Sequence, residues 1–388
     1  METKVSVVIP VYNASEHLNQ CMDTVVGQTL QEIEIICVDD GSTDSSLEIL
    51  NEYAKNDGRI KVLTQRNQFA GVARNSGMAI ATGKYIIFWD SDDYFRADAL
   101  EKMYNKCEED KADVCVCEGR HFYQNKKIET ASDSYMTNVY LPDTIPFNRK
   151  TNEKYVLNFT KAHPWNKMFR LDFVKEQGLF FQDTRNANDL FFTISALCLA
   201  ERITLVREAL VVYRMNQDTS LSKVVKTSPR IALDNWVAVR EFLIEKNALP
   251  EQSFANTVLL RIPFILRNIS DLKTFKETVN WLKKEGLEKL SLREHEEGYY
   301  YVAWRAELLH RIIVDTPEEI LFYLMTVSFD EANQKNMNLN IERAKNKAAK
   351  DKLIQEHKKE VEAIKESWSY RIGNKIVYLP GKIKRIGK

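Results

Sequence analysis

Blocks of apolar residues alternate with amphipathic segments along the first quarter of the chain. Uninterrupted apolar runs indicate strands buried on both faces, whereas apolar residues that recur every three or four positions indicate helices. The predicted strands are 5–11, 33–38, 60–63 and 84–88, and the predicted helices between them are 18–26, 45–54 and 70–80. This alternation predicts an α/β fold with a mostly parallel, Rossmann-like sheet and helices on both faces.

The fourth predicted strand ends abruptly in the acidic segment Trp89-Asp90-Ser91-Asp92-Asp93. Carboxylates this close repel one another unless a cation lies between them. Mg²⁺ usually binds one or two carboxylates and completes its shell with substrate phosphates. Two alternatives are open from this segment alone: a metal and phosphate site, or a solvated acidic turn before a helix that begins near residue 96.

The pattern becomes less regular after this segment and then turns entirely helical. Weak periodicity from 125 to 150 predicts a long loop over the active face of the sheet. Further helices are predicted at 100–107, 155–159 and 190–199, and further strands at 114–117, 179–181, 203–206 and 209–213. From residue 228 the predicted helices are 229–246, 253–269, 272–285 and 300–328.

Three domains follow from these patterns. We expect an α/β domain over 1–227, an α-helical domain over 228–340, and a long charged helix with a basic amphipathic tail over 341–388. In the tail, 367–388, six Lys or Arg residues and no Asp or Glu are interleaved with nine apolar residues. Such a segment is typical of binding to an anionic membrane surface. The alternative is a disordered tail that only keeps the protein soluble.

Composition narrows the class of protein. The chain carries 55 basic and 55 acidic residues, so its overall charge gives no indication of nucleic acid as a partner. Its six cysteines show neither a CxxC pair nor zinc spacing, and we expect them to be the reduced, buried thiols of a cytosolic protein. The N-terminus enters a predicted strand at once, and no apolar run approaches the roughly 20 residues of a membrane span. We therefore expect neither a signal peptide nor a membrane-spanning helix.

Residues suited to a nucleotide follow three of the predicted strands. Tyr12-Asn13 follows the first, Asp39-Asp40 ends the second, and Asp90 to Asp92 follows the fourth. Since the carboxyl ends of parallel strands meet at one edge of a sheet, we expect these groups to lie together. The chain has neither GxGxxG after the first strand nor GxxxxGK[ST], which argues against a dinucleotide site and a P-loop. This combination predicts a nucleoside diphosphate held by a metal ion.

Four motifs in order carry a family resemblance. They are Val-Val-Ile-Pro-Val-Tyr-Asn at 7–13, Val-Asp-Asp-Gly-Ser-Thr-Asp at 38–44, Gly-Val-Ala-Arg-Asn-Ser-Gly at 71–77 and Trp-Asp-Ser-Asp-Asp at 89–93. Over roughly residues 4–225 the chain resembles the inverting family 2 glycosyltransferases, which have the GT-A fold. Trp-Asn-Lys-Met-Phe-Arg at 165–170, and Tyr-Arg at 213–214 with Ser-Leu-Ser at 220–222, resemble bacterial members that build surface polysaccharides.

The resemblance implies a donor and metal site at the matching positions. Pro10 and Tyr12 would line the base pocket, and Asp40 would meet the base. Asp39 would support the loop or the ribose, and Arg74 would lie near the base or the diphosphate. The DXD motif of the family corresponds to Asp90, Ser91 and Asp92. In this motif Asp92 would bind Mn²⁺ or Mg²⁺, Asp90 would bind the ribose or a metal-bound water, and Ser91 would belong to the donor site.

An inverting transfer also needs a general base for the acceptor hydroxyl. Many relatives place it at the end of a Glu-Asp pair that opens a helix, and this chain has Asn188-Asp189 there. Asp189 is the predicted base, with a helix N-cap as the alternative. Asn188 departs from the family pattern and is a candidate acceptor or donor contact. Trp165 would stack on a sugar or belong to the core, and Lys167 would reach the diphosphate or pair with a carboxylate.

The expected protein is a metal-dependent inverting glycosyltransferase of cell-surface polysaccharide synthesis. It would move a sugar from a nucleoside diphosphate sugar, UDP-linked by expectation, to a saccharide or lipid-linked saccharide. We expect it in the cytoplasm, peripheral at the inner face of the cell membrane. The alternatives are an inactive scaffold of the same fold, a membrane-binding module that acts through the tail, and a sugar nucleotidyltransferase. The last would need a glycine-rich loop after the first strand, where this chain has Pro-Val-Tyr-Asn.

Overall fold

The computed structural model describes residues 2–125, 127–131, 135–215, 228–328 and 359. Residues 1–320 form one compact unit, and 321–388 form a second in which 321–328 are helical. The predicted basic tail and the Ser-Leu-Ser motif at 220–222 lie outside the described residues, as does the predicted charged helix except for residue 359. The domain boundaries expected at 227/228 and 340/341 therefore stay predictions.

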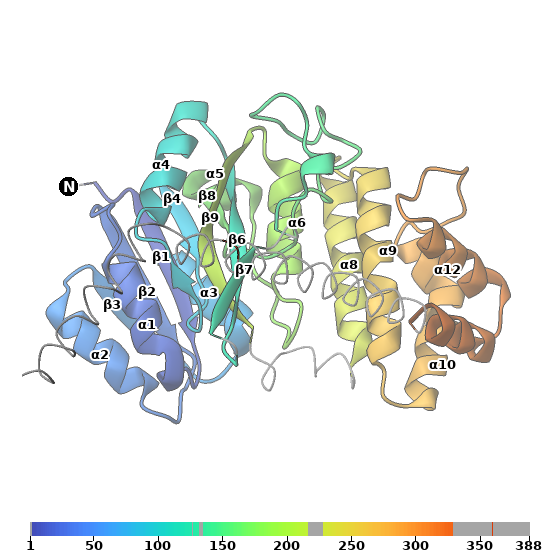
Figure 1. Cartoon of the computed structure of the whole chain (residues 1–388), viewed down its shortest axis with the longest axis horizontal. Coiled ribbons are helices and arrows are strands. Elements are labelled where there is room, and N and C mark those ends of the chain that lie inside the picture. Colours follow the sequence, from blue (N-terminus) through green and yellow to red (C-terminus); the bar gives the residue numbers. More distant parts are fainter. Residues whose placement is uncertain (1, 126, 132–134, 216–227, 329–358, 360–388) are drawn as a thin grey trace, which may run out of the picture. The chain divides into compact units, whose positions relative to one another are not determined.

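The first half of the sheet is parallel, as the apolar runs predict. Strands β1 (Val5–Val11), β2 (Ile33–Asp39), β3 (Ile60–Thr64) and β4 (Tyr85–Phe88) lie in the order β3-β2-β1-β4 (Figure 1). Helices α1 (Ser15–Val26), α2 (Ser46–Asn56) and α3 (Phe69–Ala79) connect them. Every residue of β1, β2 and β4 is buried, which explains why these strands show no polar alternation.

The second half of the sheet is mixed. Its strands are β5 (Tyr94–Phe95), β6 (Val114–Tyr123), β7 (Ile128–Ala131), β8 (Lys167–Arg170) and β9 (Ile203–Met215). Strand β8 is antiparallel to both β4 and β6, β9 is parallel to β6, and β5 is antiparallel to β9. The predicted α/β class with helices on both faces is confirmed, and the parallel order holds from β3 to β4.

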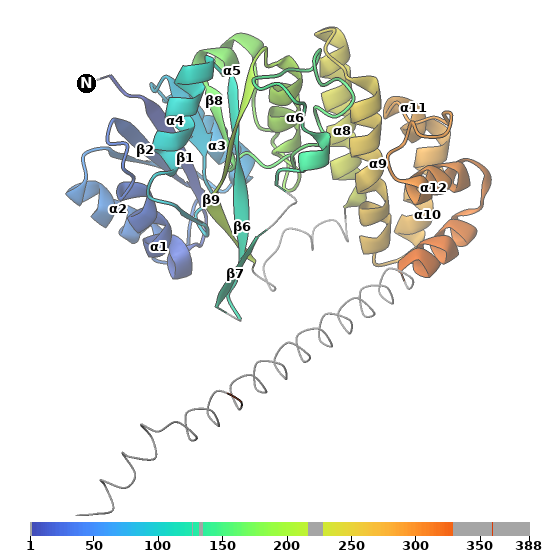
Figure 2. The same cartoon turned by 45° about the horizontal axis from the view of Figure 1, so that its top comes forward.

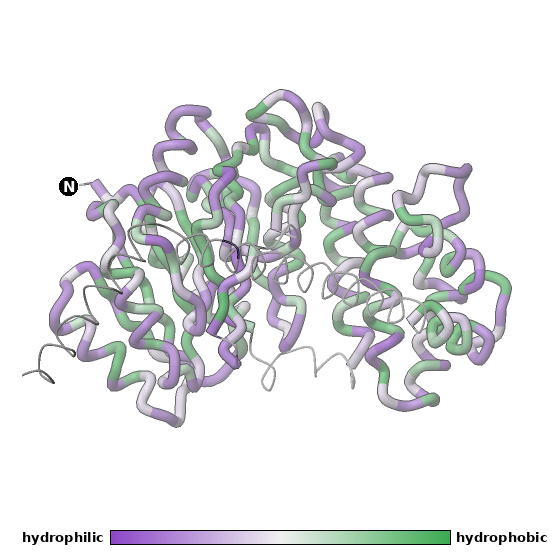
Figure 3. The backbone as a smooth tube through the Cα atoms, in the orientation of Figure 1, coloured by the Kyte–Doolittle hydropathy of each residue, from purple (hydrophilic) through white to green (hydrophobic). Residues whose placement is uncertain are grey.

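The two faces of the sheet carry different helices. Odd-numbered residues of β1, such as Val5 and Val7, pack with α1 and with α4 (Ala99–Asp110) in the main core. On the other face, Gly77 of α3 lies against Val8, where a Cβ atom would come within 2.4 Å of a Val8 methyl. The absence of a side chain there lets α3 approach the strands closely. Figure 3 shows that hydrophobic residues lie along the central strands.

A helical region completes the first unit. It contains α8 (Pro229–Glu245), α9 (Glu251–Asn268), α10 (Leu272–Trp281), α11 (Leu287–Lys289) and α12 (Ala303–Val314), with a π-helical turn at Leu282–Gly286. Helix α8 packs against α6 (Leu190–Leu199), and Figure 2 shows α8 and α9 side by side next to it. None of the helices described here has both the length and the apolar character needed to cross a membrane.

Several predicted elements differ from the structure. The helix expected over 300–328 is wrong, because α12 ends at Val314 and a second helical stretch starts at 317. The helix predicted at 155–159 is a series of turns, in which Leu157 donates its backbone N–H to Ser253 Oγ of α9. The long loop predicted at 125–150 contains β7 and the short helix η1 (Asn138–Tyr140). The strands predicted at 203–206 and 209–213 are one strand, β9, whose pairing with β6 is irregular around Glu118.

The strand predicted at 179–181 is also wrong, for a reason that sequence hides. Asn75 of α3 accepts a hydrogen bond from Phe181 N at 2.8 Å and donates one to Phe181 O at 2.7 Å. One side chain therefore satisfies the backbone groups that a strand ladder would otherwise take. The Phe181 ring stacks on Phe192 of α6 and lies against Phe88, so the apolar run reflects packing and not sheet pairing.

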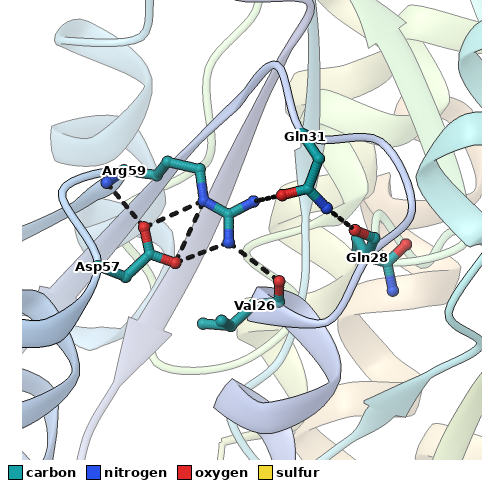
Figure 4. Close-up of polar contacts among 5 residues, drawn as sticks. All are labelled: Val26, Gln28, Gln31, Asp57 and Arg59. Carbon is teal, nitrogen blue, oxygen red and sulfur yellow. Dashed lines mark hydrogen bonds and ion pairs between the residues drawn. The ribbon is translucent and has the colours of Figure 1, made fainter.

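A separate polar network fixes the turn between α1 and β2 (Figure 4). Arg59, just before β3, donates to Val26 O at 3.0 Å and to Gln31 Oε1 at 3.0 Å, and Asp57 accepts from the same guanidinium at 2.6 Å. Gln31 in turn donates to Gln28 O at 2.6 Å. This network lies at the start of β2, and its role is to hold the α1–β2 connection in place.

Candidate functional site

The carboxyl ends of β1 and β2 lie together, as the sequence predicts. Asp40 N donates to Val11 O at 2.8 Å, so the two strands stay paired to their ends. The carboxylate of Asp40 is buried and accepts hydrogen bonds from Gln65 Nε2 at 2.8 Å and from Gln68 N at 2.9 Å. Asp39 is equally buried and accepts from the backbone N–H of Ser42 in the following turn. These contacts hold both carboxylates of the expected nucleotide site in fixed orientations.

An aromatic ring stands at the same edge. Tyr12 follows β1 after the buried Pro10, and its side chain is half exposed. An exposed ring beside two buried carboxylates can stack on a base, because each nucleobase presents an apolar face and polar edges. The structure therefore brings together Pro10, Tyr12, Asp39 and Asp40, and their nucleotide-binding roles stay predictions.

Arg74 connects the acidic segment after β4 with the segment before α6. Its guanidinium donates to Asp90 Oδ1 at 2.6 Å and to Asn188 Oδ1 at 3.1 Å, and it lies 5.3 Å from the centre of the Phe181 ring. Arg74 is almost fully buried, which strengthens charge-assisted hydrogen bonds of this kind. One side chain thus joins the expected donor site to the residue that replaces the family glutamate.

The other acidic residues after β4 face different partners. Burial and the neighbouring Asp90 charge raise the pKa of Asp92 to about 6. Asp93 is fully buried, and one of its oxygens accepts from Arg214 N of β9 at 2.8 Å. The Arg214 side chain donates back to Asp92 O at 2.8 Å. Asp93 therefore ties the acidic turn to β9, while Asp98 takes the N-cap position of α4.

The acidic turn meets the requirements of a divalent cation that also binds a substrate. Within the described ranges, no group of three or more His, Cys, Asp or Glu residues forms a complete metal cluster. Burial and then repulsion by Asp90 raise the pKa of Asp92, against the opposite effect of Arg214. A Mg²⁺ or Mn²⁺ ion would relieve this repulsion and take its remaining ligands from a diphosphate. The donor set of Asp90 and Asp92 therefore fits such an ion.

Asp189 lies at the N-cap position of α6 but caps nothing with its side chain. Its carboxylate makes no capping hydrogen bond and lies 3.8 Å from His163 Nδ1. Burial alone would raise the pKa of Asp189, but His163 and the charge of Arg74 outweigh it and lower the pKa. The N-terminus of a helix also favours a negative charge. Asp189 is therefore an ionised, partly exposed carboxylate, the form that a general base requires.

Gly71 of α3 and Asn235 of α8 fix the segment that carries the Asp189 carboxylate. Asn188 is buried and donates to Thr184 O at 3.2 Å in addition to accepting from Arg74. Gly71 of α3 packs against it so closely that a Cβ would lie 2.9 Å from Asn188 Cβ. From α8, Asn235 Nδ2 donates to Thr184 Oγ1 at 3.1 Å and to Ala187 O at 3.0 Å. Helices on both sides therefore set the position of Asp189.

A wall of aromatic rings lies beside this carboxylate, and sequence analysis missed most of it. Trp165 is buried between His163 and Tyr213, with nearly parallel rings at 5.5 and 5.7 Å. Tyr135 packs edge-on against Trp165 and bonds His121 Nε2 at 2.6 Å. Burial and the charges of the three acidic residues after β4 raise the pKa of Tyr213. The structure favours the core alternative for Trp165, and alternation along β6 and β9 was the available signal for His121 and Tyr213.

Lys167 is enclosed and bonds only uncharged acceptors in the described part of the chain. Its ammonium donates at 2.8 Å to Lys161 O, to His163 O and to Asn166 Oδ1. Burial lowers its pKa to about 7. Lys167 therefore holds the 161–166 loop in shape, and among the described residues it forms no carboxylate pair. Its contact with a diphosphate stays a prediction.

Comparison with known proteins shows that this chain is similar to glycosyltransferases. Residues 6–178 match the family model described as glycosyl transferase family 2. The putative glycosyltransferase EpsH of Bacillus subtilis is 31% identical over 263 residues, which are 65% of this chain and 72% of EpsH. Glycosyltransferase GlyA of Streptococcus pneumoniae is 28% identical over 361 residues, 88% of this chain but 51% of GlyA. The chain therefore spans about half the length of GlyA.

A solved structure has the same fold. S. aureus TarS 1–349, solved in complex with UDP-GlcNAc, superposes with a TM-score of 0.68 and 20% sequence identity. The match covers 84% of this chain and 92% of that chain. It therefore extends beyond the α/β part into the helical region.

Proposed function

Since the chain belongs to glycosyl transferase family 2, we propose that it transfers a sugar from a UDP-sugar to a glycan acceptor, with inversion and with the help of a divalent metal ion. Tyr12, Asp39 and Asp40 would hold the nucleoside, and Asp90 and Asp92 would face the diphosphate. The TarS complex with UDP-GlcNAc makes UDP-sugars the first donors to test.

The observation that carries this proposal is the bridge through Arg74. One buried guanidinium contacts Asp90 of the donor site and Asn188, the residue directly before the ionised Asp189. An inverting displacement needs a base and a leaving group held on opposite sides of the reacting carbon. The bridge would set the spacing of these two groups, and the Asn188 amide accepts from Arg74 and donates to the Thr184 carbonyl.

The residues of the chain perform distinct parts of the reaction. Asp189 would accept the proton of the attacking acceptor hydroxyl, and the field of Arg74 and His163 would keep it ionised beforehand. Mn²⁺ or Mg²⁺, held by Asp90 and Asp92, would neutralise the charge that develops on the leaving diphosphate. The aromatic wall around Trp165 would exclude water from one side of the site.

The setting of the reaction belongs to the same proposal. The acceptor would be a saccharide or lipid-linked saccharide of cell-surface polysaccharide synthesis, in line with the resemblance of the 165–170 motif to such enzymes. The protein would act in the cytoplasm, at the inner face of the membrane, where the basic segment 367–388 would attract anionic lipids. Vesicle binding by the full chain, compared with a chain that ends at 366, tests this part separately.

Thermal unfolding with UDP, GDP, CDP and dTDP, each with and without Mn²⁺, tests the donor site. A nucleotide at 100 times its dissociation constant stabilises the folded state by about 2.7 kcal/mol. We expect a metal-dependent shift with UDP that Asp92→Ala removes and that Asp98→Asn, at the partly exposed N-cap of α4, leaves intact. The absence of a shift with every nucleotide contradicts the proposal. A UDP shift without turnover of any UDP-sugar and acceptor would support the scaffold alternative.

A further inference from the structure

The imidazole of His163 faces the Asp189 carboxylate from a loop outside α6. Its Nδ1 atom lies 3.8 Å from Asp189 Oδ2, which is an ion-pairing distance, and both side chains are partly exposed. The two residues are far from each other along the loop and helix that carry them, so the contact depends on the fold. We therefore ask what holds each of the two groups in place.

The protein interior fixes the His163 ring without help from the carboxylate. The ring stacks on the buried Trp165 at 5.5 Å with an angle of 12° between the planes, and Trp165 stacks in turn on Tyr213 of β9. The backbone carbonyl of His163 accepts a hydrogen bond from the enclosed Lys167 ammonium at 2.8 Å. The imidazole is therefore a rigid group, and a mobile carboxylate next to it would take its orientation from the ring.

The Asp189 side chain lacks the contact that would fix it within its own helix. Asn188 and Asn235 hold the backbone just before it, but its carboxylate makes no capping hydrogen bond. An ionised carboxylate beside Nδ1 favours the neutral tautomer of His163 that carries its proton there. Such an imidazole donates to one carboxylate oxygen and leaves the other for a hydroxyl group. Hydrogen bonds at catalytic sites are often long before the substrate binds and shorten in the complex.

Titratable groups from several elements surround the imidazole of His163. They are Asp189 at the start of α6, Lys161 and Lys167 in its own loop, Arg261 on α9, His121 on β6, and Tyr135 and Tyr213 in the aromatic wall. Burial has the largest effect and lowers the pKa of His163 from 6.5, against the opposite effect of Asp189. The charges of Lys167 and Arg261 act in the same direction as burial. At pH 7 a neutral imidazole therefore lies beside an ionised carboxylate.

We propose that His163 is a positioning residue for Asp189, and that protonation of His163 makes the site inactive. This inference rests on the proposed function and adds the regulation of the same site by pH. In the neutral form, Nδ1–H aligns the carboxylate for the acceptor hydroxyl. When the imidazole takes up a proton from solvent, it forms an ion pair with Asp189, and an ion-paired carboxylate is a weaker base. Turnover therefore falls at low pH with the titration of His163, before Asp189 itself is protonated.

Two amide substitutions separate the position of the hydrogen-bond donor from its ability to titrate. His163→Asn places an amide nitrogen where the imidazole has Nδ1, whereas His163→Gln places it nearer to Nε2, and neither amide takes up a proton. The matched control is His310→Asn, because His310 belongs to another pair with a carboxylate, 2.6 Å from Glu294 in the helical region. Turnover by the full chain is measured between about pH 5 and pH 8 at saturating UDP-sugar and Mn²⁺. Saturating metal keeps Asp92 ionised, so differences between the variants report on His163.

Below the pKa of His163, the turnover number of the wild type should fall about tenfold per pH unit. His163→Asn should stay within about threefold of the wild type at pH 7.5 and lose this acidic fall. His163→Gln should lower the turnover number by about tenfold to 10²-fold with an unchanged KM for the donor, because the carboxylate is misdirected. UDP should stabilise all variants equally, and the control should behave as the wild type. An acidic fall that persists in His163→Asn, or equal turnover by the Asn and Gln variants, overturns the inference.

Nitrogen-15 NMR of the histidine side chains follows the pair without any turnover. Because Asp189 raises the pKa of His163, Asp189→Asn should lower this pKa and reduce the tautomer protonated at Nδ1. An unchanged pKa and tautomer of His163 in Asp189→Asn overturn the inference. If no donor and acceptor are turned over, the proposed function fails, and the NMR titration alone decides whether His163 and Asp189 form a pair.

Discussion

Glu34 on β2 offers a quantitative test of the sheet that positions the site. Its carboxylate is buried and accepts from Ser6 Oγ on β1 at 2.6 Å and from Lys61 Nζ on β3 at 2.7 Å. It also accepts from Thr82 N at 2.7 Å and from Thr82 Oγ1 at 2.9 Å, in the turn before β4. One carboxylate thus joins the neighbours on both sides of its strand.

These contacts determine how Glu34 titrates. Burial opposes ionisation, but the Lys61 pair and the hydrogen bonds from Ser6 and Thr82 outweigh it and lower the pKa from 4.5 to about 2. Because the pKa of Glu34 is lower in the folded state, the ionised carboxylate stabilises the fold fully at pH values above 4.5, its pKa in the unfolded chain. This stabilisation is lost as the pH falls through 2. The change in pKa corresponds to a free energy of unfolding of about 3 kcal/mol at pH 7 and about 2 kcal/mol at pH 3.5.

Glu34→Gln should therefore lower the free energy of unfolding by about 3 kcal/mol at pH 7, since glutamine resembles the protonated acid. Urea unfolding at pH 7 and pH 3.5, followed by the fluorescence of the buried Trp89 and Trp165, measures it. The matched control is Glu32→Gln, which removes a partly exposed pair with Lys4 and should have a much smaller effect. An effect of Glu34→Gln below about 1 kcal/mol, or equal to that of the control, would refute the reasoning.

Three further predictions concern the site. Asp189→Asn should lower the turnover of acceptor by about 10²- to 10⁴-fold while UDP still stabilises the protein, and equal losses of both would contradict a base. Because the pKa of Asp92 is about 6, Mn²⁺ affinity without nucleotide should fall about tenfold from pH 7.5 to pH 5; a constant affinity over this range would show that Asp92 is not a ligand. Gly71→Ala would place a Cβ 2.3 Å from Gln182 O, so it should destabilise the protein by about 1–3 kcal/mol in urea unfolding and reduce turnover by moving Asn188. Wild-type stability of this variant would show that the contact relaxes freely.

Sequence was sufficient for elements whose own side chains determine their structure. Strands β1, β2 and β4 are buried on both faces, so their apolar runs indicate them directly. Once these strands are known, the motif residues at their carboxyl ends are known to lie at one edge of the sheet. All six cysteines are buried and unpaired, as expected for a reduced protein. Asp189 directly precedes the helix predicted at 190–199, as the family pattern places it, and its role as a base stays a prediction.

Sequence was insufficient where a distant partner decides the outcome. Nothing local in the run at 179–181 shows that Asn75, 106 residues away, takes both backbone groups of Phe181. The bond between Arg74 and Asn188 spans 114 residues, so the departure from the family glutamate had no visible explanation. The Tyr213-Arg214 motif did not indicate its partners in the fold, because the pairing of β9 with β5 and β6 brings it to the acidic turn.

The hydrogen bonds from Asn235 have a consequence for how this protein can be rebuilt. This side chain belongs to α8, yet it holds the segment directly before Asp189. A chimera joined at residue 227 would exchange the support of Asp189, the proposed base, along with the helices, even if every motif of the α/β part were retained. We therefore expect an exchange of helical regions between relatives to succeed only where the new α8 carries an amide that donates to the 184–187 segment as Asn235 does.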